Sequence, residues 1–494
     1  MNHHASMNRI YRLIWSEVRS AWVPVAETAR GRGKSGRARS KASRNLVAGA
    51  ISLALAPLAH AAPPLAHAAS PLAHATAPCA APVCGPTTLS ATSHPLGGKV
   101  VSGSASITQV GNTTDIRQSS ADVAIDWLSF NIGSQASVDF LQPSASAVAV
   151  NRISSTNGSQ ILGHLDANGQ VYLINPNGII FGKGAEVNVG GLIASTLDVS
   201  DQSLGGSTRS FSGEGTGSIV NEGTITAANG GYVALVGNRV SNEGVISAHL
   251  GTVALGSGSA VTLDFSGDRL VHVQVDRSTL NDLAENKQLI EADGGLVIMT
   301  AGAKDALLAS VVNNTGVIEA RTVENQEGTI ELVGGMSAGT VKVGGTLDAS
   351  APQGGSGGTI ETDAAHVEVA NEAQVTTASS KGLTGSWLID PQDFTVASTG
   401  GDITGAALSK ELGTTSITLE SSQGSKAGSG NVNVDDTVSW SANTHLTLSA
   451  SNDVDVNENI SATGSTAATA VKPRIATRNL QPSRSRRRAR CSMV

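Results

Sequence analysis

The sequence feature that most constrains the fold is a short pattern that returns at nearly regular intervals. Residues 221–225 (NEGTI) recur as residues 242–246 (NEGVI), and residues 313–318 (NNTGVI) repeat the pattern again. Residues 344–349 (GGTLDA) are a weaker copy. A period of roughly 20 residues is typical of a solenoid, in which each repeat stacks on the one before it.

Each repeat is followed by an apolar segment with the composition of a β-strand: residues 232–236 (YVALV), 252–255 (TVAL) and 329–333 (TIELV). Val, Ile and Thr between Gly and Asn favour strands. We therefore predict an all-β fold, a right-handed parallel β-helix with a disordered N-terminal leader. A uniform period over residues 96–470 gives roughly 18 rungs, spaced by about 4.8 Å. A meander or a sandwich is the alternative.

The small residues of the repeats fit a thin stacked fold. The 494 residues include 56 Gly and only 14 aromatic residues, a composition that favours burying small side chains over building a thick aromatic core. We expect the Asn and Gly of each repeat at the corners of the β-helix, where these residue types adopt positive φ at little cost. Helical periodicity is scarce, and the best candidate for a short helix is residues 279–290.

The net charge of −7 is the sum of three unlike blocks. Residues 1–45 carry ten Lys or Arg and two Glu, and residues 471–494 carry eight Lys or Arg and no acid. The remaining body carries 15 basic and 38 acidic residues, a balance of −23. This acidic body argues against nucleic-acid binding. The basic tail could bind nucleic acid or lipopolysaccharide, or could follow a frameshift in a longer gene, and we favour the frameshift.

The N-terminal block has the organisation of a signal peptide. Residues 46–56 (LVAGAISLALA) are apolar, follow several Arg and Lys, and are shorter than the ~20 residues that a membrane-spanning helix needs. Small-residue cleavage sites end at Ala61, Ala68 and Ala75. We predict a removable leader at residues 1–75 and no stable transmembrane segment after it. In an oxidising compartment, Cys79 and Cys84 could form a disulfide or remain two unpaired thiols.

The most distinctive motifs lie in residues 107–200. Residues 175–178 (NPNG) have the composition of a type I turn and join two apolar strands, at 171–174 and 179–181. Further upstream, two other segments stand out, WLSFNIG at 127–133 and NRI at 151–153. Their most distinctive residues are Trp127, Phe130, Asn131, Asn151 and Arg152.

These motifs resemble the secretion domain of two-partner secretion exoproteins, the filamentous haemagglutinin family. Residues 169–179 (GQVYLINPNGI) match the family hallmark, and residues 127–133 and 190–196 match in order and spacing. The resemblance covers roughly residues 90–330, although an Asn-Pro-Asn-Leu motif that some members carry upstream is missing. Residues 385–391 (GSWLIDP) resemble a downstream segment of such proteins. Residues 7–27 resemble the extended signal peptide of the family, which places the true start at Met7.

The resemblance implies a secreted adhesin or haemagglutinin that is not an enzyme and needs no cofactor. Its first partner would be an outer-membrane β-barrel transporter with periplasmic recognition domains, and its second a receptor, such as a carbohydrate, on a host or neighbouring cell. Export would run through the periplasm to the surface of a Gram-negative bacterium. The implied secretion motif is Asn175, Pro176, Asn177, Gly178 and Ile179. The implied segments are a leader (1–75), a linker (76–95), the secretion domain (96–330), the start of a shaft (331–470) and a tail (471–494).

Two alternatives remain open. A β-helical polysaccharide-degrading enzyme could use the carboxylates of residues 435–436 and 453–458. The chain could also be the secretion domain of a haemolysin or a contact-dependent toxin. The His residues after the leader are widely scattered along the sequence, and we predict no metal site from them.

Overall fold

A computed structural model describes residues 11–16, 21–26, 89–200, 206–266, 270–278, 282–302, 310–421 and 428–473. The chain divides into two compact units, Met1–Pro82 and Val83–Val494. In the first unit, β1 (Tyr11–Ser16) and β2 (Ala21–Ala26) pair antiparallel, where we expected a leader without regular structure. The predicted cleavage sites at Ala61, Ala68 and Ala75, the pair Cys79 and Cys84, and the tail from residue 474 lie outside the described residues.

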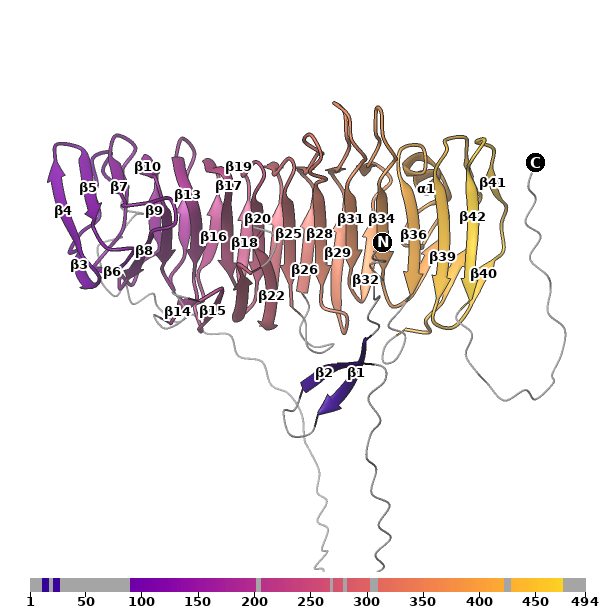
Figure 1. Ribbon diagram of the computed structural model, residues 1–494, viewed down its shortest axis with the longest axis horizontal. Helices are drawn as coiled ribbons and strands as arrows, with labels where there is room; N and C mark the ends of the chain where they lie inside the picture. Colours follow the sequence, from indigo (N-terminus) through magenta and orange to yellow (C-terminus); the bar gives the residue numbers. More distant parts are fainter. Residues whose placement is uncertain are drawn as a thin grey trace, which may run out of the picture. The chain divides into compact units, whose positions relative to one another are not determined.

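The second unit is a parallel β-helix, in which strands far apart in the sequence lie side by side (Figure 1). This confirms the predicted fold and excludes a meander or sandwich. The first parallel ladder runs through the whole described unit. Its strands are β6 (Asp122–Trp127), β8 (Val148–Ile153), β11 (Gln170–Ile174), β13 (Glu186–Ser195), β17 (Thr224–Gly237), β20 (Thr252–Ser257), β25 (Leu296–Ala301), β28 (Thr329–Gly334), β31 (Thr359–Asp363), β34 (Ser386–Asp390), β36 (Ser416–Ser421), β39 (His445–Ala450) and β42 (Ala468–Pro473).

Two further ladders complete most rungs. The second contains β5 (Thr113–Gln118), β7 (Ser137–Leu141), β10 (His164–Ala167), the first halves of β13 and β17, β19 (Val245–Ser247), β24 (Leu289–Glu291), β27 (Val317–Glu319), β30 (Thr346–Asp348) and β33 (Gln374–Thr376). The third contains β9 (Ser159–Ile161), β12 (Ile179–Phe181), β16 (Ser218–Asn221), β18 (Arg239–Asn242), β23 (Asp282–Asn286), β26 (Ser310–Asn314), β29 (Gly339–Val343) and β32 (His366–Val369).

Other elements cover the N-terminal end and one outer face of the β-helix, and a further set forms part of its last rungs. At the N-terminal end, β3 (Lys99–Ser102) and β4 (Ala105–Val110) pair antiparallel with β6 and β5. An antiparallel overlay sheet consists of β14 (Asp198–Val199), β15 (Thr208–Ser212), β21 (Ala260–Asp264) and β22 (His272–Arg277). The last rungs contain β35 (Phe394–Val396), α1 (Gly405–Glu411), β37 (Val432–Val434), β38 (Val438–Trp440), β40 (Val454–Val456) and β41 (Ile460–Ala462).

The rungs are longer and fewer than the repeat predicted. The first ladder has thirteen strands in the described residues, against the roughly 18 rungs expected from a uniform period. Tyr232 stacks on Thr252 at the spacing of the repeat. Thr252 stacks on Leu296 across a much longer stretch of chain, because the intervening residues leave the rung to form β21 and β22. The prediction was wrong because such excursions interrupt the spacing, and because the later rungs are themselves longer than the repeat, as where Thr329 stacks on Thr359 and Ser386 on Ser416.

The asparagines of the repeats lie inside the β-helix and form one continuous stack. The stack consists of Asn221, Asn242, Asn286 and Asn314, all 0% exposed. The side-chain amides of the first three each donate to the Oδ1 of the next asparagine at 2.8 Å, and that of Asn314 donates to backbone carbonyls. None of the four has a positive φ, and the non-glycine residues that do, among those described, are Leu250 and Glu324. The expectation of left-handed corners was therefore wrong here, because the amide is selected for its ability to donate and accept along the stack.

The glycines of the repeats are required by the close approach of neighbouring rungs. A Cβ added at Gly244 would collide with the carbonyl oxygen of Gly223, and one at Gly345 with that of Gly316. None of these four glycines has a positive φ. Successive rungs approach so closely at this corner that a side chain has no room, which explains the recurring glycine better than backbone freedom does.

A single apolar core runs through the stacked rungs, and a second cluster lies beneath the overlay sheet. The second cluster includes Tyr172, Tyr232, Phe211 and Ile298. Residues 279–290, the best helix candidate in the sequence, contain β23 and part of β24, while residues 279–281 lie outside the described residues. That prediction was wrong, since stacking on the rungs before and after overrides the weak local preference for helix. The α-helix in the described residues is α1 instead.

Candidate functional site

The turn at residues 175–178 joins β11 to β12 and holds its shape through buried contacts. Gly178 N–H donates to the Asn175 carbonyl oxygen at 3.0 Å, which confirms a four-residue turn. Asn175 is 0% exposed, and its side-chain amide donates to Ser159 Oγ at 3.0 Å and to the Asn157 carbonyl oxygen at 3.2 Å. Its Oδ1 accepts the Asn177 N–H at 3.0 Å. Gly178 has a φ of 104°, a conformation that favours glycine.

Only part of the predicted secretion motif faces solvent. Ile179 is 2% exposed and belongs to the main core. Pro176 and Asn177 are exposed at the tip of the turn, and the Asn177 side-chain amide donates to the Ser155 carbonyl oxygen at 2.8 Å. The five motif residues thus separate into three that build the turn and two that a partner could touch.

A surface groove of about 730 Å³ lies beside this turn. It is lined by Asn177 and Gly178 of the turn, Gln160 on β9, Val220 on β16 and Asn131, among others. None of the lining residues has a charged side chain. The polar groups on its walls are amides and hydroxyls, which offer both donors and acceptors. The groove therefore suits an uncharged partner that forms hydrogen bonds.

The upstream motif residues mainly support the fold. Trp127 Nε1 donates to Asn151 Oδ1 at 2.9 Å, and both side chains are buried. Phe130 packs edge-on against the Trp127 ring, with centroids 5.3 Å apart. Asn131 has a double role, because its Oδ1 accepts the Gln160 N–H at 2.8 Å while the residue also lines the groove.

Arg152 fixes the overlay sheet to the β-helix. Its Nε lies 3.0 Å from Asp198 Oδ1, and one terminal nitrogen donates to the Val199 carbonyl oxygen at 2.8 Å. Both partners belong to β14. The structure thus brings Trp127, Phe130 and Asn151 together in the core and places Arg152 on the outer face, away from that cluster.

Of the carboxylates considered for an enzyme, those of Asp435 and Asp436 serve local structure. Both oxygens of Asp436 accept backbone N–H groups, from Gly405 at 2.8 Å and Thr437 at 2.9 Å. Asp435 Oδ1 accepts from the Asn457 side chain at 2.6 Å. Their hydrogen bonds anchor the start of α1 and connect neighbouring rungs.

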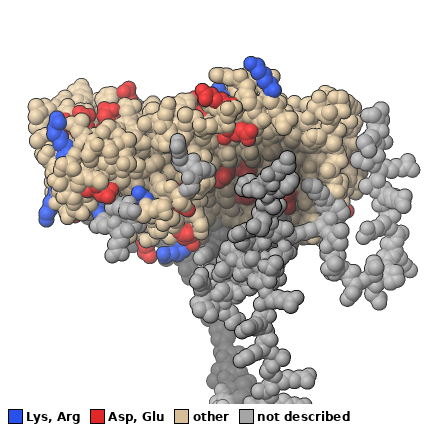
Figure 2. Space-filling view, viewed as in Figure 1, with Lys and Arg blue, Asp and Glu red and all other residues tan. Residues whose placement is uncertain are grey.

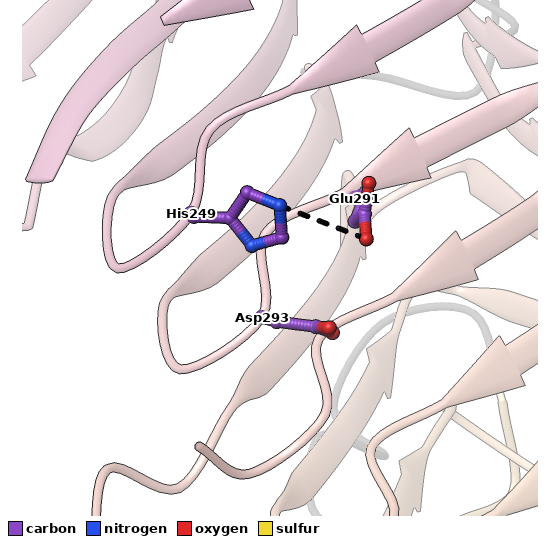
Figure 3. Close-up of side chains that lie close together, drawn as sticks. All are labelled: His249, Glu291 and Asp293. Atoms are coloured by element: carbon purple, nitrogen blue, oxygen red, sulfur yellow. Dashed lines mark ion pairs between the residues drawn. The ribbon is translucent and has the colours of Figure 1, made fainter. Parts of the chain in front are cut away.

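One ionisable cluster was missed in the sequence (Figure 3). His249 Nε2 lies 3.8 Å from Glu291 Oε1, and Asp293 lies beside them. The three could in principle hold a metal ion. However, Arg321 occupies the coordinating atoms: its Nη2 lies 2.8 Å from Asp293 Oδ2 and 3.4 Å from Glu291 Oε1. A fixed guanidinium supplies the positive charge that a cation would bring, so we interpret the cluster as an ion-pair network.

Aligning the repeats would have found this network. The residues that follow the equivalent Ile or Leu of each rung stack in register, so that Ser247, Glu291, Glu319 and Asp348 are successive partners. Two positions further along the chain stand His249, Asp293 and Arg321. Because a solenoid places equivalent repeat positions one rung apart, residues that are distant in the sequence become direct neighbours.

Acidic side chains also gather on the outer face of the first ladder. Glu331 stacks on Glu361, and Asp363 stacks on Asp390. Burial, together with a hydrogen bond and repulsion from Glu361, raises the pKa of Asp363 to about 9. Burial is also the main cause of the raised pKa of Glu331. Figure 2 shows acidic side chains in small clusters on a largely uncharged surface.

The family model of the TPS secretion domain matches residues 91–349, more than half of the chain. The chain belongs to this family. A model of the extended signal peptide of type V secretion matches residues 7–56, beginning at the Met7 start that the sequence suggested. A protein with this leader and a TPS secretion domain is exported through the periplasm to the cell surface or beyond. Within the part of the chain that the structure describes, no helix is both long and apolar enough to cross a bilayer.

Relatives of this TPS secretion domain come from Haemophilus influenzae. Two heme/hemopexin-binding proteins are 36% identical over 256 residues and 33% identical over 268 residues. These matches cover about half of this chain but only 28% of each relative. The crystal structure of the HMW1 secretion domain is 27% identical, with a TM-score of 0.56, and covers 76% of this chain and 100% of that chain. This likeness agrees with the β-helix described above.

Proposed function

We propose that this chain is the exported member of a two-partner secretion pair and that the tip of the hallmark turn contacts its outer-membrane transporter. The observation that carries the proposal is the division of the hallmark motif inside a TPS secretion domain. Asn175, Gly178 and Ile179 build the turn, whereas Pro176 and Asn177 are exposed beside a groove without charged lining. Exposed side chains whose loss leaves the fold intact are the expected carriers of recognition.

The partner is an outer-membrane β-barrel transporter, which recognises the exported chain through its periplasmic domains. Amides at the groove wall, such as Asn131 and Gln160, can pair with the backbone groups of a peptide segment of those domains. Once outside, the β-helical shaft acts as an adhesin, binding a receptor such as a carbohydrate on a host or neighbouring cell. Its role is recognition and not catalysis.

Export measured in a cell tests the transporter contact. The chain is expressed in a Gram-negative host with and without a candidate two-partner transporter, and the protein in the medium is quantified. We expect export to depend on the transporter and to fall at least tenfold in the double variant Pro176→Ala/Asn177→Ala. The variant must keep the unfolding midpoint of the parent chain.

The matched control is Asn112→Ala. Asn112 is also an exposed asparagine in a tight turn, at the junction of β4 and β5, and it does not line the groove. Its substitution should leave export unchanged. Equal export of the double variant and the control would refute the proposed contact. Agglutination of red cells without lysis by the exported protein would support an adhesin over a haemolysin, whereas lysis would contradict it.

A further inference from the structure

The second ladder is interrupted at one place where the first ladder continues. In the first ladder, β31, β34 and β36 stack without a break. In the second ladder, β33 pairs with β30, and no following strand pairs with it in the described residues. The segment at the next level contains α1 (Figure 1), and the contacts of α1 with β38 place that strand at the level after it. A helix thus stands in the place of a strand.

Side chains from this segment occupy the hydrogen-bonding edge of β33. Val375 N–H donates to Glu411 Oε2 at 2.7 Å, and Thr377 N–H donates to Thr415 Oγ1 at 3.0 Å. The Thr414 hydroxyl donates to the Val375 carbonyl oxygen at 3.2 Å. The Lys410 ammonium donates to the Ala373 carbonyl oxygen at 2.5 Å. Residues 373, 375 and 377 alternate along the strand, so their groups all belong to one edge. The bonds that a neighbouring strand would make are therefore made by side chains.

The same segment also contacts the rung that follows. Ser439 N–H, in β38, donates to Ser409 Oγ at 2.9 Å. On its inner side, α1 and the residue after it contribute Leu408 and Leu412, both 0% exposed, to the main core. Thr404 caps the first turn of the helix by accepting the Ala407 N–H. The helix is therefore fitted between two rungs and attached to both.

Glu411 is the most specialised residue of this segment. It is 3% exposed, and Lys410 Nζ lies 3.1 Å from its Oε1. A buried carboxylate carries a large desolvation cost unless it has partners. The bond that explains this buried carboxylate is the one it accepts from the Val375 N–H at the edge of β33. An apolar side chain could fill the same space but could not accept that hydrogen bond.

We propose that residues 404–415 form an edge strap, which ends the second ladder at β33 and prevents this edge from pairing with a strand of another copy of the chain. An unprotected strand edge is a ready template for association, and natural proteins cover such edges. The strap closes only this ladder, because the first ladder continues past it from β36 to β39. This inference is independent of the transporter contact, since it concerns the opposite part of the β-helix.

The test compares two double variants of the whole exported chain. Glu411→Leu/Thr415→Val removes both acceptors from the edge of β33. Glu372→Leu/Thr418→Val is the matched control, since Glu372 is exposed and neither side chain contacts that edge. We expect hydrogen exchange at the Val375 and Thr377 amides to become roughly 10–100-fold faster in the strap variant. We also expect concentration-dependent self-association of this variant by light scattering, and neither effect in the control.

Further variants keep the proposal falsifiable. Glu411→Gln retains an acceptor for the Val375 N–H and should restore most of the protection. If the double variant does not fold, Thr415→Val alone should expose the Thr377 amide and spare the Val375 amide. Unchanged protection in the strap variants, or equal self-association of the control, would overturn the proposal.

Discussion

The asparagine stack and the hallmark turn use the same residue type for opposite purposes. In the stack, Asn242 and Asn286 bond each other and have no exposed surface. In the turn, Asn175 is equally buried, but its contacts hold a loop whose next two residues face solvent. The difference teaches that a recurring Asn in a β-helix does not mark a functional residue by itself. In the stack, the buried amide bonds another asparagine side chain. In the turn, the buried amide holds a loop whose next two residues are exposed.

The largest expected effect comes from breaking the stack. Asn286→Leu keeps the approximate shape but removes one acceptor of the Asn242 amide, which keeps its bonds to two backbone carbonyls, and leaves the Asn314 Oδ1 without its donor. We expect the free energy of unfolding to fall by about 2–5 kcal/mol. Urea unfolding of the exported chain measures this loss. The control is Asn313→Leu, because Asn313 is next to Asn314 but points outward. A loss of similar size in the control would contradict the role given to the stack.

A smaller effect is expected at the buried residue of the turn. Asn175→Ala removes the bonds to Ser159 and Asn157, and it frees the Asn177 N–H. We expect a loss of about 1–3 kcal/mol, less than in the stack because the turn lies at the surface and water can replace some partners. Export should fall as well, because the exposed tip loses its support. If a destabilised Asn175→Ala variant were exported at the level of the parent chain, the turn would have no part in recognition by the transporter.

The sequence predicted the stacked architecture but not its irregularities. The repeated NEGTI pattern was sufficient for a parallel β-helix, because one unit per rung leaves few other solutions. It could not give the number of rungs, since the close copies cover only part of the chain, whereas the excursion that forms β21 and β22 and the longer later rungs depart from their spacing. The α1 helix was also missed, although Thr404 as a cap, Leu408 and Leu412 at helical spacing, and Gly413 after the end are its local signals.

The sequence predicted where the candidate site lies, but not which of its residues are buried and which are exposed. The motif at residues 175–179 was identified from its resemblance to a family, which treats the residues alike. Which of them is buried depends on Ser159 and Asn157 of the preceding rung and on Ser218 of the following one. These neighbours are fixed only when the rungs stack, so no local pattern could reveal them.

The acidic side chains stacked on the outer face contrast with the asparagines stacked inside the β-helix. Amides that stack attract each other, whereas burial and the neighbouring carboxyl groups disfavour a negative charge on Asp363 where it stacks on Asp390. The raised pKa of Asp363, about 9, means that the folded state holds a proton that the unfolded state releases above its ordinary value near 3.8. Stability from this group is therefore greatest below that value and is lost as the pH rises toward 9.

Replacing the Asp363 carboxylate tests the contrast between the inward amide stack and the outward acidic stack, and it is expected to change stability less than the two asparagine variants do. Asp363→Asn should raise the Tm at pH 8 by about 2–4 °C, and the difference from the parent chain should disappear near pH 4. Thermal unfolding followed by circular dichroism across this pH range provides the measurement. Glu372→Gln, at an exposed position, is the control and should have no such effect. A destabilised Asp363→Asn at pH 8 would show that the carboxylate supports the fold.

The most direct test of the account is the affinity of the exported chain for the periplasmic domains of its transporter, measured by titration with the parent chain and with Asn177→Ala. Asn177 is exposed, and water can replace the hydrogen bond of its side chain to the Ser155 carbonyl oxygen, so its replacement should change the free energy of unfolding by less than about 0.5 kcal/mol. The account predicts at least tenfold weaker binding at unchanged stability. Equal affinity of the two proteins would contradict it, because the exposed tip of the turn would then have no part in recognition.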